Sequence, residues 1–270
     1  MKINRQFALL ALLVAIPAQA QGPTDASLHD FEPDGEYEFQ IDGKAVPGAE
    51  VARANHLPAY LIISKSLAAP VLLLPRESVA KAVPADALVR RADGVIDVAA
   101  GAKITSVGPL TIAGDGASFQ QGGKTLSLRA KAPLTGLHTA ADIETFNPAF
   151  RRRAERYVPN ADAIKALRAN KRKVIVRVVF GSWCPHCQAK LPNLIRAERE
   201  LNGTPIAIEY YGLPRPPAAW TDAEAVRLGV SSLPTAIVSV DGQEVGRIPS
   251  SSWDSPENML ARIVTATTAR

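Results

Sequence analysis

The sequence predicts an α+β protein in which a small, mainly antiparallel β domain precedes an α/β domain with a mixed sheet flanked by helices. Short apolar segments separated by glycine-rich turns fill residues 36–132, a pattern typical of antiparallel strands. From residue 160 onward, strand-like and helix-like segments alternate. The only two cysteines of the chain, Cys184 and Cys187, lie between the first strand and the longest helix of this second region.

Residues 1–20 have the composition of a secretory signal peptide. Lys2 and Arg5 form a basic start, residues 7–16 are apolar, and Ala18-Gln19-Ala20 is a small-x-small cleavage site. The apolar run is too short to span a bilayer as a stable helix, so an uncleaved anchor is the lesser alternative. We therefore expect cleavage after Ala20 and export into an oxidising compartment.

The composition of the chain is that of an ordinary soluble protein. Its 270 residues suit one large domain or two ordinary ones, and 47% are hydrophobic and 21% charged. The formal charge of +5 falls to +3 when Lys2 and Arg5 leave with the signal peptide. Two basic clusters, residues 151–153 and 171–173, are interpreted as solvated helix faces and ends, so no nucleic-acid partner is predicted.

Residues 21–35 are polar and interrupted by proline and glycine, which predicts a flexible lead-in. In the β domain that follows, residues 37–41 alternate apolar and polar side chains and meet Asp42-Gly43, a hairpin signal. Further strands are predicted at residues 59–64, 71–74, 95–99, 110–113, 117–120 and 125–128. The region contains no catalytic constellation, and His56 is interpreted as a local structural or surface histidine.

Residues 133–159 are predicted to be a linker that contains one helix. Residues 133–145 have the composition of connecting chain. Asn147 and Pro148 then mark a helix start, and Phe150 and Ala154 fall on one face of that helix. Pro159 ends the segment.

The second domain is predicted over residues 160–270. Asn160 caps a helix over residues 161–169, and the apolar residues 174–180 form a strand buried on both faces. A helix over residues 188–201 contains Pro192 and is followed by a strand at residues 206–211. Residues 221–224 form a capping box for a short helix. Strands at residues 236–240 and 243–248 form a hairpin, and a last helix starts at Pro256.

Cys184 and Cys187 are predicted to be a reversible redox pair. They are separated by two residues at the start of a helix, where the helix dipole and His186 favour the Cys184 thiolate, the reactive species. A structural disulfide that closes so short a loop would restrict the unfolded chain little. A closed zinc site needs four ligands, and the remaining histidines are scattered, so neither a metal nor a cofactor is expected.

Three features of this domain resemble the thioredoxin family. Trp183-Cys184-Pro185-His186-Cys187 follows a buried strand, Pro192 lies five residues after the second cysteine, and Leu233-Pro234-Thr235 precedes a hairpin. The resemblance covers roughly residues 160–270. It implies that Cys184 attacks a substrate disulfide, that Cys187 resolves the mixed disulfide, and that Pro185 and His186 tune the pair. It further implies that a cis Pro234 faces the motif, with Leu233 and Trp183 contacting an extended substrate.

The sequence departs from the family in two places. Members often bury an acid six residues before the first cysteine, and Val178 occupies that position here. Glu209 on the neighbouring strand is the hypothesised replacement as proton acceptor, the alternative being a solvent-facing residue. The Cys-Pro-His-Cys spelling resembles periplasmic thiol oxidases of the disulfide-bond-forming family, but the 47 residues between Cys187 and Pro234 leave no room for their helical insertion. Oxidase, reductase and isomerase roles all stay open.

The function expected from the resemblance is that of a periplasmic thiol–disulfide oxidoreductase acting on cysteine-containing protein substrates. A membrane redox partner would return the cysteine pair to its starting oxidation state after each reaction. A β domain joined to a thioredoxin-like domain also resembles the dimeric periplasmic isomerases, which makes homodimerisation a hypothesis. The alternative is an envelope binding or assembly module in which the β domain does the work and the redox domain is accessory.

Overall fold

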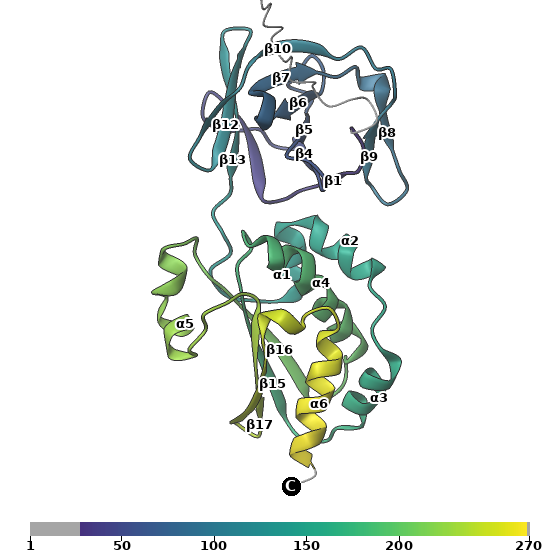
Figure 1. Ribbon diagram of the computed structural model, residues 1–270, viewed down its shortest axis with the longest axis vertical. Helices are drawn as coiled ribbons and strands as arrows, with labels where there is room; N and C mark the ends of the chain where they lie inside the picture. Colours follow the sequence, from purple (N-terminus) through teal and green to yellow (C-terminus); the bar gives the residue numbers. More distant parts are fainter. Residues whose placement is uncertain (1–27, 269–270) are drawn as a thin grey trace, which may run out of the picture.

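The computed structural model describes residues 28–268, and the predicted signal peptide, residues 1–20, lies outside the described residues. The described chain forms a β domain at one end and a helix-covered sheet at the other (Figure 1). Among residues 28–268, no helix is both long enough and apolar enough to cross a lipid bilayer.

The β domain consists of two antiparallel sheets. The larger sheet has the spatial order β10 (Thr105–Pro109), β7 (Val79–Ala82), β6 (Val71–Leu74), β5 (Tyr60–Ile63), β4 (Glu50–Ala54), β1 (Phe31–Pro33), β9 (Ile96–Val98) and β8 (Leu88–Arg90). The smaller sheet has the order β11 (Thr111–Ala113), β12 (Gly116–Gln121), β13 (Lys124–Ala130), β2 (Tyr37–Ile41) and β3 (Lys44–Ala45). The β2–β3 turn contains Asp42 and Gly43, both at positive φ, as the hairpin signal predicts.

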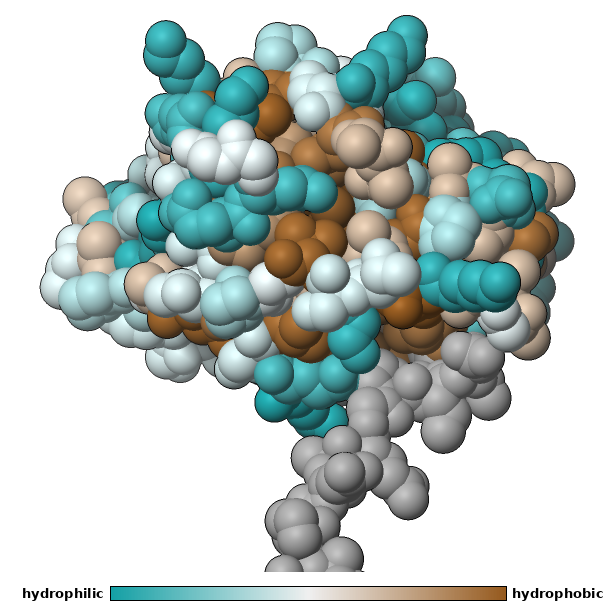
Figure 2. Space-filling view, turned by 90° about the horizontal axis from the view of Figure 1, so that it is seen from above, coloured by the Kyte–Doolittle hydropathy of each residue, from teal (hydrophilic) through white to brown (hydrophobic). Residues whose placement is uncertain are grey.

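Two apolar clusters hold the β domain together. One surrounds Phe31 and Leu72, and the other lies between the two sheets around Phe39 and Phe119. Seen from the β-domain end, hydrophobic side chains show in the middle of the face and hydrophilic side chains lie around the rim (Figure 2). That face points away from the helix-covered sheet (Figure 1).

The C-terminal sheet has the order β14 (Gly136–His138), β16 (Ile206–Gly212), β15 (Val174–Phe180), β17 (Thr235–Val240) and β18 (Gln243–Ile248). Strand β15 is central, parallel to β16 and antiparallel to β17, which confirms the expected mixed sheet. The helices are α1 (Ala140–Phe146), α2 (Pro148–Arg156), α3 (Ala161–Ala169), α4 (Pro185–Glu200), α5 (Ala223–Arg227) and α6 (Pro256–Thr268).

Helices cover the two faces of this sheet unequally. In Figure 1, α3, α4 and α6 lie on one side of the sheet and α5 on the other. Side chains on consecutive residues of β16 mark the two faces: the Tyr210 hydroxyl donates to Glu198 of α4, whereas the Tyr211 hydroxyl lies 3.5 Å from Asp222, which caps α5. The main core includes Tyr210, Trp253 and both cysteines on the α4 side of the sheet, and it also contains Ala225 of α5.

Several sequence predictions need correction. The flexible lead-in is wrong over residues 28–35, because Leu28 and Phe31 are buried in the core and β1 pairs with both β4 and β9. Residues 133–145 are not connecting chain: they form β14, which pairs with β16, and α1, which begins at a capping box made by Thr139. The cap of α5 is Asp222 and not Thr221.

The interpretation of the basic cluster at residues 151–153 as solvated is also wrong for two of its members. The Arg152 guanidinium donates to Pro33 O at 2.5 Å, and Arg153 binds Glu32 at 3.0 Å. These side chains therefore join α2 to the β domain.

Candidate active site

The cysteine pair lies where β15 passes into α4. β15 ends at Phe180, and a turn closed by a hydrogen bond from Cys184 N to Gly181 O leads into the helix. Cys184 is the N-cap of α4, so its sulfur takes the place of a capping oxygen and accepts from Cys187 N at 3.5 Å. Pro185 occupies the first helical position, where a missing N–H costs nothing.

The pKa values of the two thiols are shifted in opposite directions. A hydrogen bond from the Cys187 side chain, helped by the backbone N–H groups of Cys187 and His186 and by the charge of His186, lowers the pKa of Cys184 to about 6 against burial. Burial raises the pKa of Cys187 well above its ordinary value, and the neighbouring Cys184 adds to the effect. Cys184 is therefore the thiolate-forming group and Cys187 holds its proton.

His186 is exposed, and its ring is oriented from outside the motif. Nε2 lies 2.9 Å from Ser250 O in the 3-10 helix η5 (Ser250–Ser252). Because a carbonyl oxygen only accepts, Nε2 must carry a proton in this arrangement. The ring thus stays beside the N-terminus of α4, where a positive charge on it stabilises the Cys184 thiolate.

Pro234 and Leu233 lie close to the motif. The peptide bond between them is cis. The β15–β17 register pairs Val179 with Thr235, which brings Pro234 level with the end of β15 from which the motif emerges. Leu233 belongs to the same buried cluster as both cysteines.

Trp183 is half-buried and held in place. Its indole Nε1 donates to Leu213 O at 3.0 Å. A Cβ added at Gly181 would lie 2.7 Å from the indole ring, so glycine at that position lets the ring pack over the turn. Its proposed contact with substrate stays a prediction.

Glu209 is not positioned as a proton acceptor for Cys187. It precedes Tyr210, and because side chains alternate along a strand, its side chain lies on the face opposite α4. There the carboxylate accepts from Arg177 Nη2 at 2.6 Å and Nε at 3.0 Å, and Arg177 also binds Glu224 of α5. Glu209 is an ion-pair partner on the half-exposed face of the sheet.

The structure adds residues that the sequence analysis missed. Gln188, directly after Cys187, is buried and donates to Ser182 O in the turn and to Glu36 of the β domain. Glu36 is buried as well and lies 3.3 Å from Arg215. In the sequence, the one indication of a role for Gln188 is that a polar residue stands on the first turn of a helix expected to be buried. No local pattern links it to Glu36, which lies 152 positions earlier.

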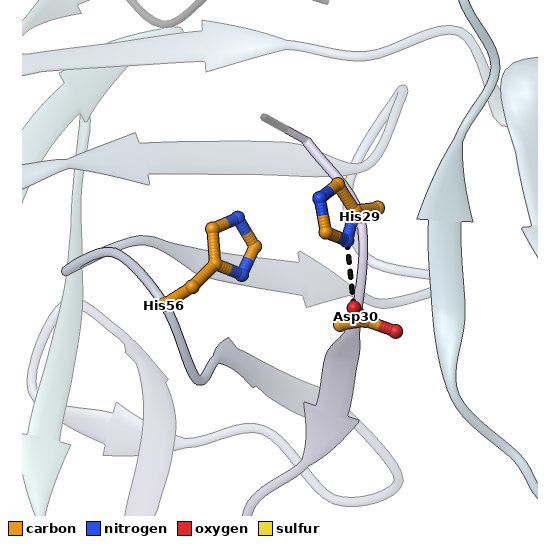
Figure 3. A group of neighbouring side chains, drawn as sticks. All are labelled: His29, Asp30 and His56. Carbon is orange, nitrogen blue, oxygen red and sulfur yellow. Dashed lines mark hydrogen bonds and ion pairs between the residues drawn. The ribbon is translucent and has the colours of Figure 1, made fainter. Parts of the chain in front are cut away.

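Within the described residues, one group could offer three ligands to a metal ion: His29, Asp30 and His56 (Figure 3). The two imidazole rings stack with centroids 4.4 Å apart, and His29 Nδ1 lies 2.7 Å from one Asp30 oxygen. The other Asp30 oxygen accepts from the Arg91 guanidinium. Arg91 already pairs with Asp30 and the two imidazole rings stack on each other, so the group is described as a histidine stack beside an Asp30–Arg91 ion pair on the β domain, away from the cysteines.

Comparisons with known proteins give only distant similarity. No protein-family model matches the chain, and no curated protein matches it. Among solved structures, a protein of unknown function from Pseudomonas aeruginosa is 17% identical over 48% of this chain and 88% of its own, with a TM-score of 0.37. Thioredoxin-2 of the malaria parasite is 22% identical over 36% of this chain and 85% of its own, with a TM-score of 0.28. A thioredoxin variant from Halobacterium salinarum is 20% identical over 41% and 87%, with a TM-score of 0.26.

These similarities are too low to carry a functional argument. The class of fold follows from the chain's own topology: a mixed five-stranded sheet with the cysteine pair at the point where its central strand passes into the next helix. The C-terminal part of the molecule therefore has a thioredoxin-like fold.

Proposed function

We propose that the protein is a thiol–disulfide oxidoreductase that exchanges disulfides with protein substrates through Cys184 and Cys187. The observation that carries the proposal is the opposite tuning of the two thiols, with the pKa of Cys184 lowered to about 6 and that of Cys187 raised. At neutral pH such a pair presents one thiolate nucleophile and one protonated thiol.

In the reducing direction, the Cys184 thiolate attacks one sulfur of a substrate disulfide. A Cys184–substrate bond forms, the substrate S–S bond breaks, and one substrate thiolate leaves. Cys187 then gives up its proton to solvent or to the leaving thiolate and attacks the Cys184 sulfur. The Cys184–Cys187 disulfide forms, the second substrate thiolate is released, and two electrons have passed to the substrate. Oxidation of a substrate dithiol follows the same steps in reverse.

Substrate would lie beside Leu233 and Pro234, where an extended segment can pair with the backbone next to the sulfurs. Trp183 borders the same turn. We further propose that the chain is exported to the periplasm after cleavage at Ala20 and that a membrane redox partner recharges the cysteines. Mass spectrometry of the mature N-terminus in a periplasmic fraction would test export, and the mass of the protein in solution would test homodimerisation.

The direct test compares the parent protein with Cys184→Ser in insulin reduction and in oxidation of a reduced substrate. We expect the parent to be active in at least one assay and the variant in neither. Equal rates for both proteins would reject the proposed enzymatic function. The alternative, a binding module in which the β domain does the work, would then stand.

The redox potential of the pair then decides the direction of electron flow. A value near roughly −120 mV indicates a substrate oxidant, and one near roughly −270 mV indicates a reductant.

A further inference from the structure

The side chain of Gln188, the residue after Cys187, is hydrogen-bonded to the β domain. Its amide nitrogen donates to Glu36 Oε2 at 2.8 Å and to Ser182 O at 2.9 Å, and its amide oxygen accepts from Arg53 Nη2 at 3.1 Å. Glu36 directly precedes β2, and Arg53 lies on β4. With 3% of its surface exposed, Gln188 has both amide protons and its oxygen engaged at a buried junction.

The backbone of the same residue is held by a second contact. In a regular helix the carbonyl of residue 188 would accept from the N–H of residue 192, but that residue is Pro192 and has none. Arg153 Nη1 of α2 supplies the missing donor at 2.9 Å. The other guanidinium nitrogens of Arg153 donate to Glu32 on β1 at 3.0 and 3.3 Å. Through Arg153, the β domain also reaches the carbonyl that proline leaves unpaired.

The carboxylates in this junction are buried. Glu32, Asp34 and Glu36 are 8%, 9% and 5% exposed. Arg53 lies 3.3 Å from Asp34 and 3.9 Å from Glu36, so the charges are paired across the junction. Removing the partner of a buried charge is strongly destabilising. The contacts on Gln188 are therefore costly to break, unlike exposed ion pairs.

We infer that the β domain positions the first turn of α4 through Gln188 and thereby sets how strongly that turn stabilises the Cys184 thiolate. The turn is short: Gln188 N donates to Cys184 O at 2.9 Å, and Cys187 N reaches Cys184 Sγ at 3.5 Å. Since an electrostatic interaction at this range changes steeply with distance, a small displacement of residue 188 changes the field at the sulfur. Glu36, Arg53 and Arg153 act as positioning residues because none of the contacts described for residues 28–268 joins them to the Cys184 sulfur.

The catalytic consequence of this inference rests on the proposed function, but its test does not. The rate of iodoacetamide alkylation of the reduced full-length protein, followed against pH, gives the pKa of Cys184 directly. We expect Gln188→Ala and Arg153→Ala each to raise that pKa by about half a unit or more, which slows alkylation roughly threefold below pH 6. Arg196→Ala is the matched control: it removes an ion pair of α4 with Glu200 on the same helix that does not involve the β domain, and should leave the profile unchanged.

A structural role alone would lower stability and leave the profile of the folded protein in place. If Gln188→Ala fails to fold, Glu36→Gln keeps the side-chain volume and carries the same test. Parent-like pKa values, within about 0.2 units, in the folded variants would overturn the inference even if the parent is an active oxidoreductase. An inactive parent whose variants shift the pKa would instead reject the proposed function and leave the inference standing.

Discussion

The sulfurs of the two cysteines have different surroundings, which predicts a difference in their reactivity. Cys184 Sγ accepts from the first turn of α4, whereas Cys187 is fully buried. We expect iodoacetamide to modify Cys184 alone, with a rate that rises through about pH 6 and levels off above it, since the thiolate of a group with a lowered pKa forms at lower pH. Mass spectrometry of the modified protein identifies the modified cysteine. If the midpoint of the rate against pH lay near the ordinary pKa of a thiol, the lowered pKa of Cys184 would be contradicted.

The same difference predicts which cysteine variant traps substrate. In the proposed reaction, Cys187→Ser keeps the attacking thiolate but removes the resolving thiol, so it should accumulate a mixed disulfide with substrate. Cys184→Ser should accumulate none, because the remaining thiol is buried and protonated. Non-reducing gels with and without dithiothreitol measure the complex, and equal trapping by both variants would show that the roles are assigned incorrectly.

A substitution of Glu209 tests on which face of the sheet its side chain lies. Because its carboxylate pairs with Arg177 on the face away from α4, Glu209→Gln should leave the rate of mixed-disulfide resolution unchanged. The pair is half-exposed, with 26% and 38% of the side chains accessible, so the free energy of unfolding should fall by less than about 1 kcal/mol. Stopped-flow measurement of resolution in the variant would detect a role in proton transfer as a slower second step.

At the scale of elements, the sequence predicted strands and helices best where the signal is local. The buried run at residues 174–180 and the capped helix at 161–169 have the predicted bounds. Strands β4, β7, β8 and β10 were not predicted, because they have mixed or polar composition and are strands only through pairing with their neighbours. Helix α1 was not predicted either, although its capping box, Thr139 with Asp142, is a local sequence signal.

The N-cap residue of α2, Asn147, also forms hydrogen bonds with the β domain, so its substitution tests how much those contacts stabilise the protein. Asn147 Oδ1 accepts from Ala149 N and from Gly35 N, both at 3.0 Å, and Nδ2 donates to Asp34 at 3.2 Å. Asn147→Ala should lower the free energy of unfolding by about 2–4 kcal/mol, since it removes a cap and leaves buried polar groups unpaired. Asn160→Ala, which removes a cap bond to Ala163 N alone, should cost about 1 kcal/mol in the same urea titration. Equal losses would mean that the contacts to Gly35 and Asp34 add nothing.

At the scale of the whole molecule, the junction between the β domain and the helices depends on a close backbone approach. A Cβ at Gly35 would lie 2.3 Å from Phe146 O and 2.6 Å from the Asn147 Cα. We expect Gly35→Ala to separate these segments and to speed amide hydrogen exchange in α1, α2 and the first turn of α4. Gly108→Ala, whose Cβ would meet its nearest neighbour at 3.8 Å, should leave exchange in these segments unchanged. Parent-like exchange in Gly35→Ala would mean that the junction tolerates the added methyl group.

The sequence by itself determined the spacing of the cysteine pair, the strand before it and the helix after it, because hydrophobic periodicity, caps and motif spacing act over a few residues. Only the tertiary structure decided which polar groups surround that pair. Glu209 faces away from α4 because the sheet pairing fixes the face on which its side chain lies. Glu36 reaches Gln188 across 152 positions because the β domain packs against the start of α4, a contact that no local pattern encodes.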